Sequence, residues 1–231
     1  MLYLPAVLLG YLLGSFPSGV VVVRLVRRMD VRRIGSRRSG ATNVFRAAGL
    51  LPALVVFFLD VLKGTAAVWV GRWLAGSAWV QERWQTLFSR PAGWPLPAEA
   101  FSPLYAGLLC GLAAIAGHNW PVYIRFQGGR GVATTLGTLL PLAPAVAGTA
   151  SLLGLIVVLA SRYASLGSIV GAALVPPGLL LQACFLPFSL PLFLYGLLVS
   201  GLLVFQHRDN IARLLSGTER RLGWPAGPPP A

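Results

Sequence analysis

The sequence predicts an all-α integral membrane protein with seven transmembrane helices, an external N-terminus and a cytoplasmic C-terminus. Of its 231 residues, 56% are hydrophobic and 11% are charged, about half the charged fraction of soluble domains. Apolar runs long enough to cross a bilayer recur along the chain, and arginines gather in the connections between them. The net charge of +13 therefore reflects topology and attraction to anionic membrane lipid, and we expect no nucleic-acid partner.

The first three spans follow from this pattern. Residues 2–23 form the first span, because they lack the features of a cleaved signal peptide. The segment 24–46 holds eight arginines and one acid, which makes it a cytoplasmic loop and puts the N-terminus outside. After a second span at 51–73, the connection 76–102 carries interfacial tryptophans at positions 79, 84 and 94 and is an outer loop. A third span, 103–116, returns the chain to the cytoplasm.

Prolines divide the second half of the chain. Pro141 and Pro144 split the apolar stretch 132–160 into a short fourth span and a fifth that ends at residue 161. The sixth span (166–185) and the seventh (190–205) follow, and residues 208–215 form an interfacial amphipathic helix. A six-span count would put the basic C-terminal tail on the wrong side. We expect residues 1–222 to be a single domain and 223–231 to be a disordered tail.

The connection between spans three and four concentrates polar chemistry. It contains His118 and the turn Gly128-Gly129-Arg130-Gly131. Consecutive glycines beside an arginine can present backbone N–H groups as a cationic cradle for phosphate. A flexible glycine-rich connector is the alternative interpretation.

Three further cytoplasmic connections carry similar groups, listed here: Ser36, Asn43 and Arg46 in the first loop; Ser165 and Ser168 after span five; His207 and Asn210 after span seven. Hydroxyl, amide and arginine donors suit an oxyanion. Two alternatives to a binding role remain. The two serines would cap the next helix, and the histidine would lie at a solvated helix end. Because four such connections lie on one side, the sequence indicates phosphorylated substrates.

Asp60 and Lys63 lie within span two, where each isolated charge costs about 2.5–3.5 kcal/mol. Their spacing puts them on one helix face, either as a structural ion pair or with Lys63 supporting an anion site. Cys110 and Cys184 match no metal or redox spacing. We therefore expect no metal and no cofactor.

Six motifs in this order resemble the bacterial acyl-phosphate–glycerol-3-phosphate acyltransferases, the PlsY family: GSFPSG at 14–19, GSxxxGATNVFR at 35–46, LDVLKG at 59–64, GHNWPVYIRFQGGRGVAT at 117–134, SRYASLGS at 161–168 and HRDNIARLLSGTE at 207–219. The resemblance implies a seven-helix enzyme of the bacterial cytoplasmic (inner) membrane with its active site on the cytoplasmic side. Such an enzyme transfers a fatty acyl group from acyl phosphate to the 1-hydroxyl of sn-glycerol 3-phosphate. The products are lysophosphatidic acid and phosphate, in the first step of phospholipid synthesis.

The resemblance also implies roles. Phosphate would be bound by Ser36 and Arg46, the Gly128–Gly131 turn would cradle the acyl phosphate, and Glu219 would orient basic residues. The full predicted substrate-binding set is Ser36, Asn43, Arg46, His118, Gly128, Gly129, Arg130, Gly131, Ser165, His207 and Asn210, with Arg46, Arg130 and His207 as catalytic residues. The chain departs from the family at Gln127 and Arg130, where lysines are usual, at 37–39, and in its longer 76–100 loop.

The mechanism we expect is direct attack without an acyl-enzyme, since no nucleophile motif is present. The proton acceptor is His118, His207 or a substrate phosphate, and the phosphate is favoured because neither histidine has a carboxylate neighbour in the sequence. The rival interpretations are a transporter for a phosphorylated anion and a structural scaffold. A transporter would carry polar groups on both membrane sides, whereas here they collect on one.

Overall fold

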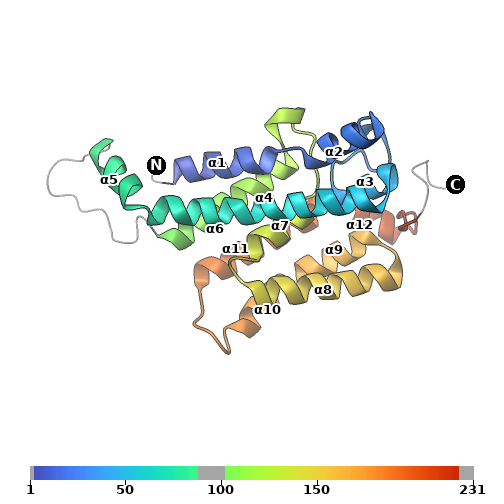
Figure 1. Ribbon diagram of the computed structural model, residues 1–231. Helices are drawn as coiled ribbons and strands as arrows, with labels where there is room; N and C mark the ends of the chain where they lie inside the picture. Colours follow the sequence, from blue (N-terminus) through green and yellow to red (C-terminus); the bar gives the residue numbers. More distant parts are fainter. Residues whose placement is uncertain (1–2, 88–101, 224–231) are drawn as a thin grey trace.

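The computed structural model describes residues 3–87 and 102–223, and within these ranges the secondary structure is entirely helical. The helices run back and forth along one axis (Figure 1). They are α1 (Leu4–Ser15), α2 (Ser18–Arg27), η1 (Val31–Arg33), α3 (Ala41–Ala48), α4 (Leu50–Gly76), α5 (Ala78–Leu87), α6 (Pro103–Asn119), η3 (Val122–Ile124), α7 (Val132–Leu139), α8 (Pro144–Ser161), α9 (Ala164–Ala173), α10 (Val175–Gln182), α11 (Leu190–Gln206) and α12 (Arg208–Leu215). The prediction of an all-α membrane protein is confirmed.

In the part of the chain that the structure describes, four helical stretches are long and apolar enough to cross a membrane: Leu4–Arg27, Leu50–Gly76, Pro144–Ser161 and Ala164–Gln182. The bent pair α11–α12 would make a fifth. Helix α6 has 17 residues and α7 has 8, so α7 is only about 12 Å long against a hydrocarbon core of about 30 Å. The short fourth helix predicted between residues 132 and 141 is therefore present, but it does not have the length of a full span.

Prolines shift several predicted boundaries. The break predicted at Pro141 and Pro144 ends at residue 143, because Pro144 occupies the first turn of α8, where its missing N–H costs nothing. The predicted first span is broken at Phe16-Pro17 into α1 and α2, and the predicted sixth span is divided into α9 and α10 just before Pro176. The predicted outer loop begins with α5, while the rest of that loop (88–101) and the tail (224–231) lie outside the described residues.

The central helix α4 contacts α1, α3, α6 and α7. Glycines permit the closest of these contacts. A Cβ on Gly64 of α4 would meet the Thr134 carbonyl of α7, and a Cβ on Gly137 of α7 would meet the Val61 carbonyl of α4. Small residues are common at helix interfaces in membranes for this reason. This reciprocal contact fixes α7 against α4 directly after the glycine-arginine turn.

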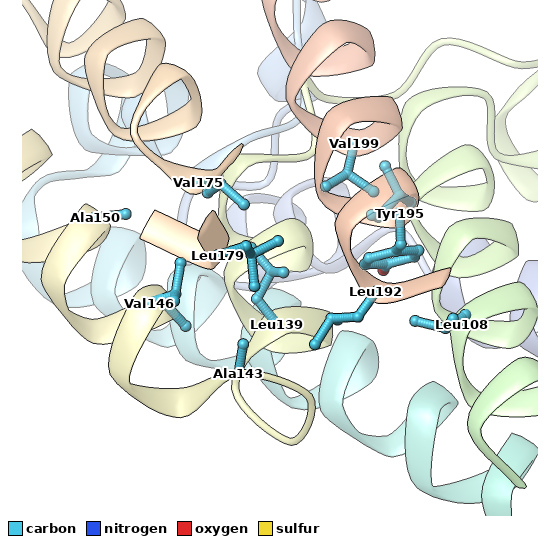
Figure 2. Packing of buried hydrophobic residues seen from close by; sticks show 12 residues of the cluster. Leu108, Leu139, Ala143, Val146, Ala150, Val175, Leu179, Leu192, Tyr195 and Val199 are labelled. Carbon is cyan, nitrogen blue, oxygen red and sulfur yellow. The ribbon is translucent and has the colours of Figure 1, made fainter. Parts of the chain in front are cut away.

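A separate hydrophobic core joins the later helices. Figure 2 shows Val146 of α8, Leu179 of α10 and Tyr195 of α11 pointing toward one another, with Leu139 of α7 between them. All four side chains are buried. The second half of the bundle is thus held by ordinary apolar packing.

The Asp60–Lys63 ion pair faces the interior of the bundle. Lys63 Nζ lies 2.9 Å from Asp60 Oδ1 and donates to the Phe16 carbonyl at 3.0 Å, at the break between α1 and α2. Ser18 Oγ donates to Asp60 Oδ1 at 2.6 Å. Both charged side chains are buried, so the structural ion pair considered for these residues is confirmed. Lys63 thus adds a second donor to the Phe16 carbonyl, which also accepts from the Ser18 N–H at 3.0 Å.

Replacing Gly64 with Ala should destabilise the protein by about 1–3 kcal/mol, because the added methyl group would overlap the Thr134 carbonyl and push α7 away from α4. Gly148→Ala in α8 is the matched control, since nothing lies within 4 Å of the position its Cβ would take. Thermal unfolding of the purified proteins in detergent measures both changes. Equal unfolding midpoints for the two variants would contradict the close contact.

Lys63→Met should cost about 3–5 kcal/mol in stability, because it leaves the Asp60 carboxylate buried without its cation. The double variant Asp60→Asn/Lys63→Met removes both charges and should be more stable than Lys63→Met alone. Unfolding midpoints of the single and double variants test this as a double-mutant cycle. A Lys63→Met protein as stable as the wild type would show that the pair is dispensable.

Candidate active site

A cavity of about 650 Å³ lies at the end of the bundle formed by α3 and α12 (Figure 1). It collects residues from connections far apart in the sequence. Nine predicted site residues line it: Ser36, Asn43, Arg46, His118, Arg130, Gly131, Ser165, His207 and Asn210. Gly128 and Gly129 do not. The four connections that carry polar groups in the sequence thus converge on one space.

Asn43 organises the first loop. Its Nδ2 is within 3.0, 3.1 and 2.9 Å of the carbonyl oxygens of Val31, Ile34 and Arg38, and its Oδ1 accepts from the Ser36 N–H at 3.0 Å. These contacts occupy the amide. In this structure Asn43 therefore positions Ser36 and the loop around it, and its amide has little capacity left for a substrate.

The glycine-arginine turn packs against the end of α6. The Gly129 N–H donates to the His118 carbonyl at 3.1 Å, and a Cβ on Gly129 would collide with His118 Nε2. Gly131 has a φ of +83°, a conformation that favours glycine, and begins α7. One N–H group expected to face a phosphate is therefore already used within the protein, and the turn serves to present Arg130 to the cavity.

Arg46 and Arg130 supply positive charge from opposite halves of the chain. Arg130 Nε donates to the Gln206 carbonyl at 3.1 Å, which fixes the side chain and leaves its terminal nitrogens for a ligand. Burial is the main reason that the pKa of Arg130 falls to about 10, so the side chain is still charged at neutral pH. Burial also lowers the pKa of Arg46, whose Nε is buried and finds no hydrogen-bond partner among the described residues. A buried, unsatisfied guanidinium nitrogen needs an acceptor, which an anionic ligand can provide.

Glu219 joins three site residues. Its Oε1 accepts from Ser165 Oγ at 2.8 Å and from Asn210 Nδ2 at 2.6 Å, and its Oε2 lies 2.8 Å from Arg213 Nε. The prediction that Glu219 orients a basic residue agrees with the Arg213 contact. Ser165 is thus tied to this carboxylate, while Asn210 Oδ1 is buried and unpaired.

The two histidines differ in their surroundings. His118 Nδ1 lies 3.5 Å from Asp60 Oδ1, so the expectation that neither histidine has a carboxylate beside it is wrong for His118. Asp60 and His118 are separated in the chain by the 57 residues from 61 to 117, and this separation hides their contact from the sequence. His207 Nδ1 lies 2.8 Å from the Leu203 carbonyl, which can only accept, so Nδ1 carries the proton and Nε2 is the nitrogen left for other contacts.

Part of the cavity wall is apolar. It is formed by Leu54 and Phe57 of α4 and by Leu155 and Val158 of α8. Cationic loops at one end and apolar helix faces at the other suit a ligand with a charged head and a hydrocarbon chain. Among the described residues no group of three metal-ligating side chains is found, and the donor set here is one for anions.

Sequence reasoning missed several cavity residues. Asp60 appeared only as a partner of Lys63, and Arg213 and Arg220 appeared only as members of a basic tail. All three line the cavity. The signal that could have identified Asp60 was its cost within an apolar helix, since ionisable groups there commonly serve a function.

Comparisons with known proteins agree with this architecture. The model of the family described as glycerol-3-phosphate acyltransferase matches residues 4–217. A relative of that name from Thermoanaerobacter pseudethanolicus (strain ATCC 33223 / 39E) is 36% identical over 216 residues, covering 94% of this chain and 93% of that protein.

Two similar crystal structures are of PlsY (YgiH), an integral membrane glycerol 3-phosphate acyltransferase. The glycerol 3-phosphate form has a TM-score of 0.76 and 32% identity and covers 96% of both chains. The lysophosphatidic acid form has a TM-score of 0.72 and 31% identity and covers 96% of this chain and 95% of that one. The chain described here is therefore a multi-pass membrane protein that belongs to the glycerol-3-phosphate acyltransferase family.

Proposed function

We propose that this protein transfers a fatty acyl group from acyl phosphate to the 1-hydroxyl of sn-glycerol 3-phosphate, giving lysophosphatidic acid and phosphate. The observation that carries this proposal is the cavity itself, in which cationic and hydroxyl side chains from four connections meet an apolar wall. Membership of the family and the two ligand forms of the similar crystal structures support the same reaction. This reaction is the first step of phospholipid synthesis.

The proposed topology has seven spans with the N-terminus outside and the active site at the cytoplasmic face of a bacterial inner membrane. Its support among the described residues is the series α1 with α2, α4, α6, the short α7, α8, α9 with α10, and α11, in which α7 takes the place of the fourth span. Arginines of the first loop and of α12 lie at the cavity end, as the positive-inside rule requires of a cytoplasmic face. Residues 1–222 form one domain in this proposal.

Positioning and charge neutralisation carry most of the proposed catalysis. Acyl phosphate is already activated, and its leaving group is phosphate. Arg46 and Arg130 hold the two phosphoryl groups and stabilise charge that develops in the transition state. Alignment of the two substrates contributes several kcal/mol, up to about 7–11 in the best intramolecular models. The hydroxyl of glycerol 3-phosphate then attacks the acyl carbon directly, and phosphate leaves.

A substrate phosphate is the proton acceptor we propose. The His118 ring is buried between Asp60 and Gly129, with little room for a substrate hydroxyl. His207 donates through Nδ1 to a carbonyl, which stabilises its protonated form less than a carboxylate would. Each phosphate group, in contrast, brings its own acceptor oxygens to the reacting hydroxyl.

Arg46→Ala and Arg130→Ala should each lower kcat/KM by at least about 100-fold, because each removes a preorganised cation from the phosphoryl groups. Arg27→Ala is the matched control, since this arginine ends α2 with its side chain exposed and does not line the cavity. Transfer of acyl groups to radiolabelled glycerol 3-phosphate measures the rate, and unfolding midpoints confirm that each variant folds. Wild-type rates in both cavity variants would refute the site.

The donor is tested in the same assay by comparing acyl phosphate, acyl-CoA and acyl carrier protein. Acyl phosphate alone should support turnover by the purified protein. Uptake of glycerol 3-phosphate into proteoliposomes without any acyl transfer would instead favour a transporter.

A further inference from the structure

Residues 217–222, named the C-terminal strap here, cross beside the cavity after α12. Glu219, Arg220 and Leu222 of the strap line the cavity. The Leu222 N–H donates to the Arg162 carbonyl at 2.7 Å, and Glu219 is tied to Ser165 as described above. The strap is therefore attached near its middle to the first turn of α9, through Ser165, and at its end to the α8–α9 connection, through Arg162. The family model ends at residue 217, three residues before Arg220.

Arg220 reaches from the strap toward the first cytoplasmic loop. A Cβ on Gly35 would lie 3.8 Å from Arg220 Nη1, which brings the guanidinium next to the residue that precedes Ser36. The side chain is half-buried, and within the described residues no hydrogen bond or ion pair engages it. Arg220 thus lies beside Gly35, the residue before the phosphate-binding candidate Ser36, and no acceptor among the described residues engages it.

Arg46 is a second cation that lines the same cavity as Arg220. The positive charge of Arg220 contributes to lowering the pKa of Arg46, second only to burial. Two guanidinium groups held close together repel each other unless an anion lies between them. Because Arg46 Nε is also unsatisfied, the pair presents free donors and excess charge to one region of the cavity.

The neighbouring Arg221 has a different environment. Its side chain is exposed, its Nε donates to Tyr163 Oη at 3.2 Å, and its guanidinium carbon lies 5.4 Å from the centre of the same ring. It does not line the cavity. Of these two consecutive arginines, Arg220 therefore lines the cavity and Arg221 does not.

We propose that Arg220 is a further substrate-binding residue, which grips the phosphate of glycerol 3-phosphate together with Ser36 and Arg46. The inference rests on the proposed function. Glycerol 3-phosphate is fully water-soluble and arrives from the side of the loops and the strap. The acyl phosphate, in contrast, must lay its chain along the apolar wall of α4 and α8, away from Arg220.

Arg220→Ala should raise the KM for glycerol 3-phosphate by about 10-fold or more, the expected loss of a hydrogen-bonded charge contact. The KM for acyl phosphate should change by less than about 2-fold, because Arg220 does not contact that substrate in the proposal. Arg221→Ala, which removes the same charge one position later, should leave both KM values near those of the wild type. Arg220→Lys should fall between Arg220→Ala and the wild type, because it keeps the charge but loses the bidentate fork.

Steady-state kinetics with each substrate varied in turn separate the outcomes, and Arg220→Gln serves if the alanine variant unfolds. An unchanged KM for glycerol 3-phosphate, an equal effect of Arg220→Ala and Arg221→Ala, or a selective rise in the KM for acyl phosphate would each overturn the assignment. If the wild type is active and Arg46→Ala is inactive, such a result excludes Arg220 from substrate binding and leaves the proposed function in place. A wild-type protein without acyl transfer would overturn the proposed function, and this inference with it.

Discussion

The buried Asp60 carboxylate is the interaction on which the first half of the molecule depends. One oxygen lies within reach of Ser18 in α2, Lys63 in α4 and His118 in α6. A charge this deep in an apolar bundle is tolerated only when it is paired and hydrogen-bonded. These three partners therefore fix the relative positions of their helices. Through His118 the same contact reaches the Gly129 peptide and the turn that presents Arg130.

The cavity combines this fixed framework with an excess of positive charge. Six arginines line it against three carboxylates, Asp60, Asp209 and Glu219. Two of these carboxylates are already engaged by the protein, Asp60 by Lys63 and Glu219 by Arg213. The uncompensated charge suits two phosphorylated substrates, each carrying about −1.5 to −2 near neutral pH. Binding both would relieve repulsion among the arginines, which couples the binding of one substrate to that of the other.

The sequence was sufficient for the fold class and for the set of connections that meet at the cavity. Hydropathy and arginine distribution located the apolar helices because the bilayer imposes one length on every span. They also predicted a short helix that ends before Pro141, but not the close packing of Gly64 against the Thr134 carbonyl that seats α7 on α4. Tertiary structure alone determines that Asn43 holds Ser36 and that Asp60 lies near His118. No local pattern encodes contacts between residues that the fold alone brings together.

The two halves of the cavity are stabilised by different means, and this bears on how the site works. Asp60 fixes the first half from within the membrane, whereas Glu219 fixes Ser165 and Asn210 from a segment that follows the last helix. Glu219, Ser165 and Asn210 are buried as well, so the contacts that hold the second half are shielded from water like those of Asp60. Both halves of the site are therefore held in place before substrate binds, the first by a cluster within the bundle and the second by a carboxylate on the segment that follows α12.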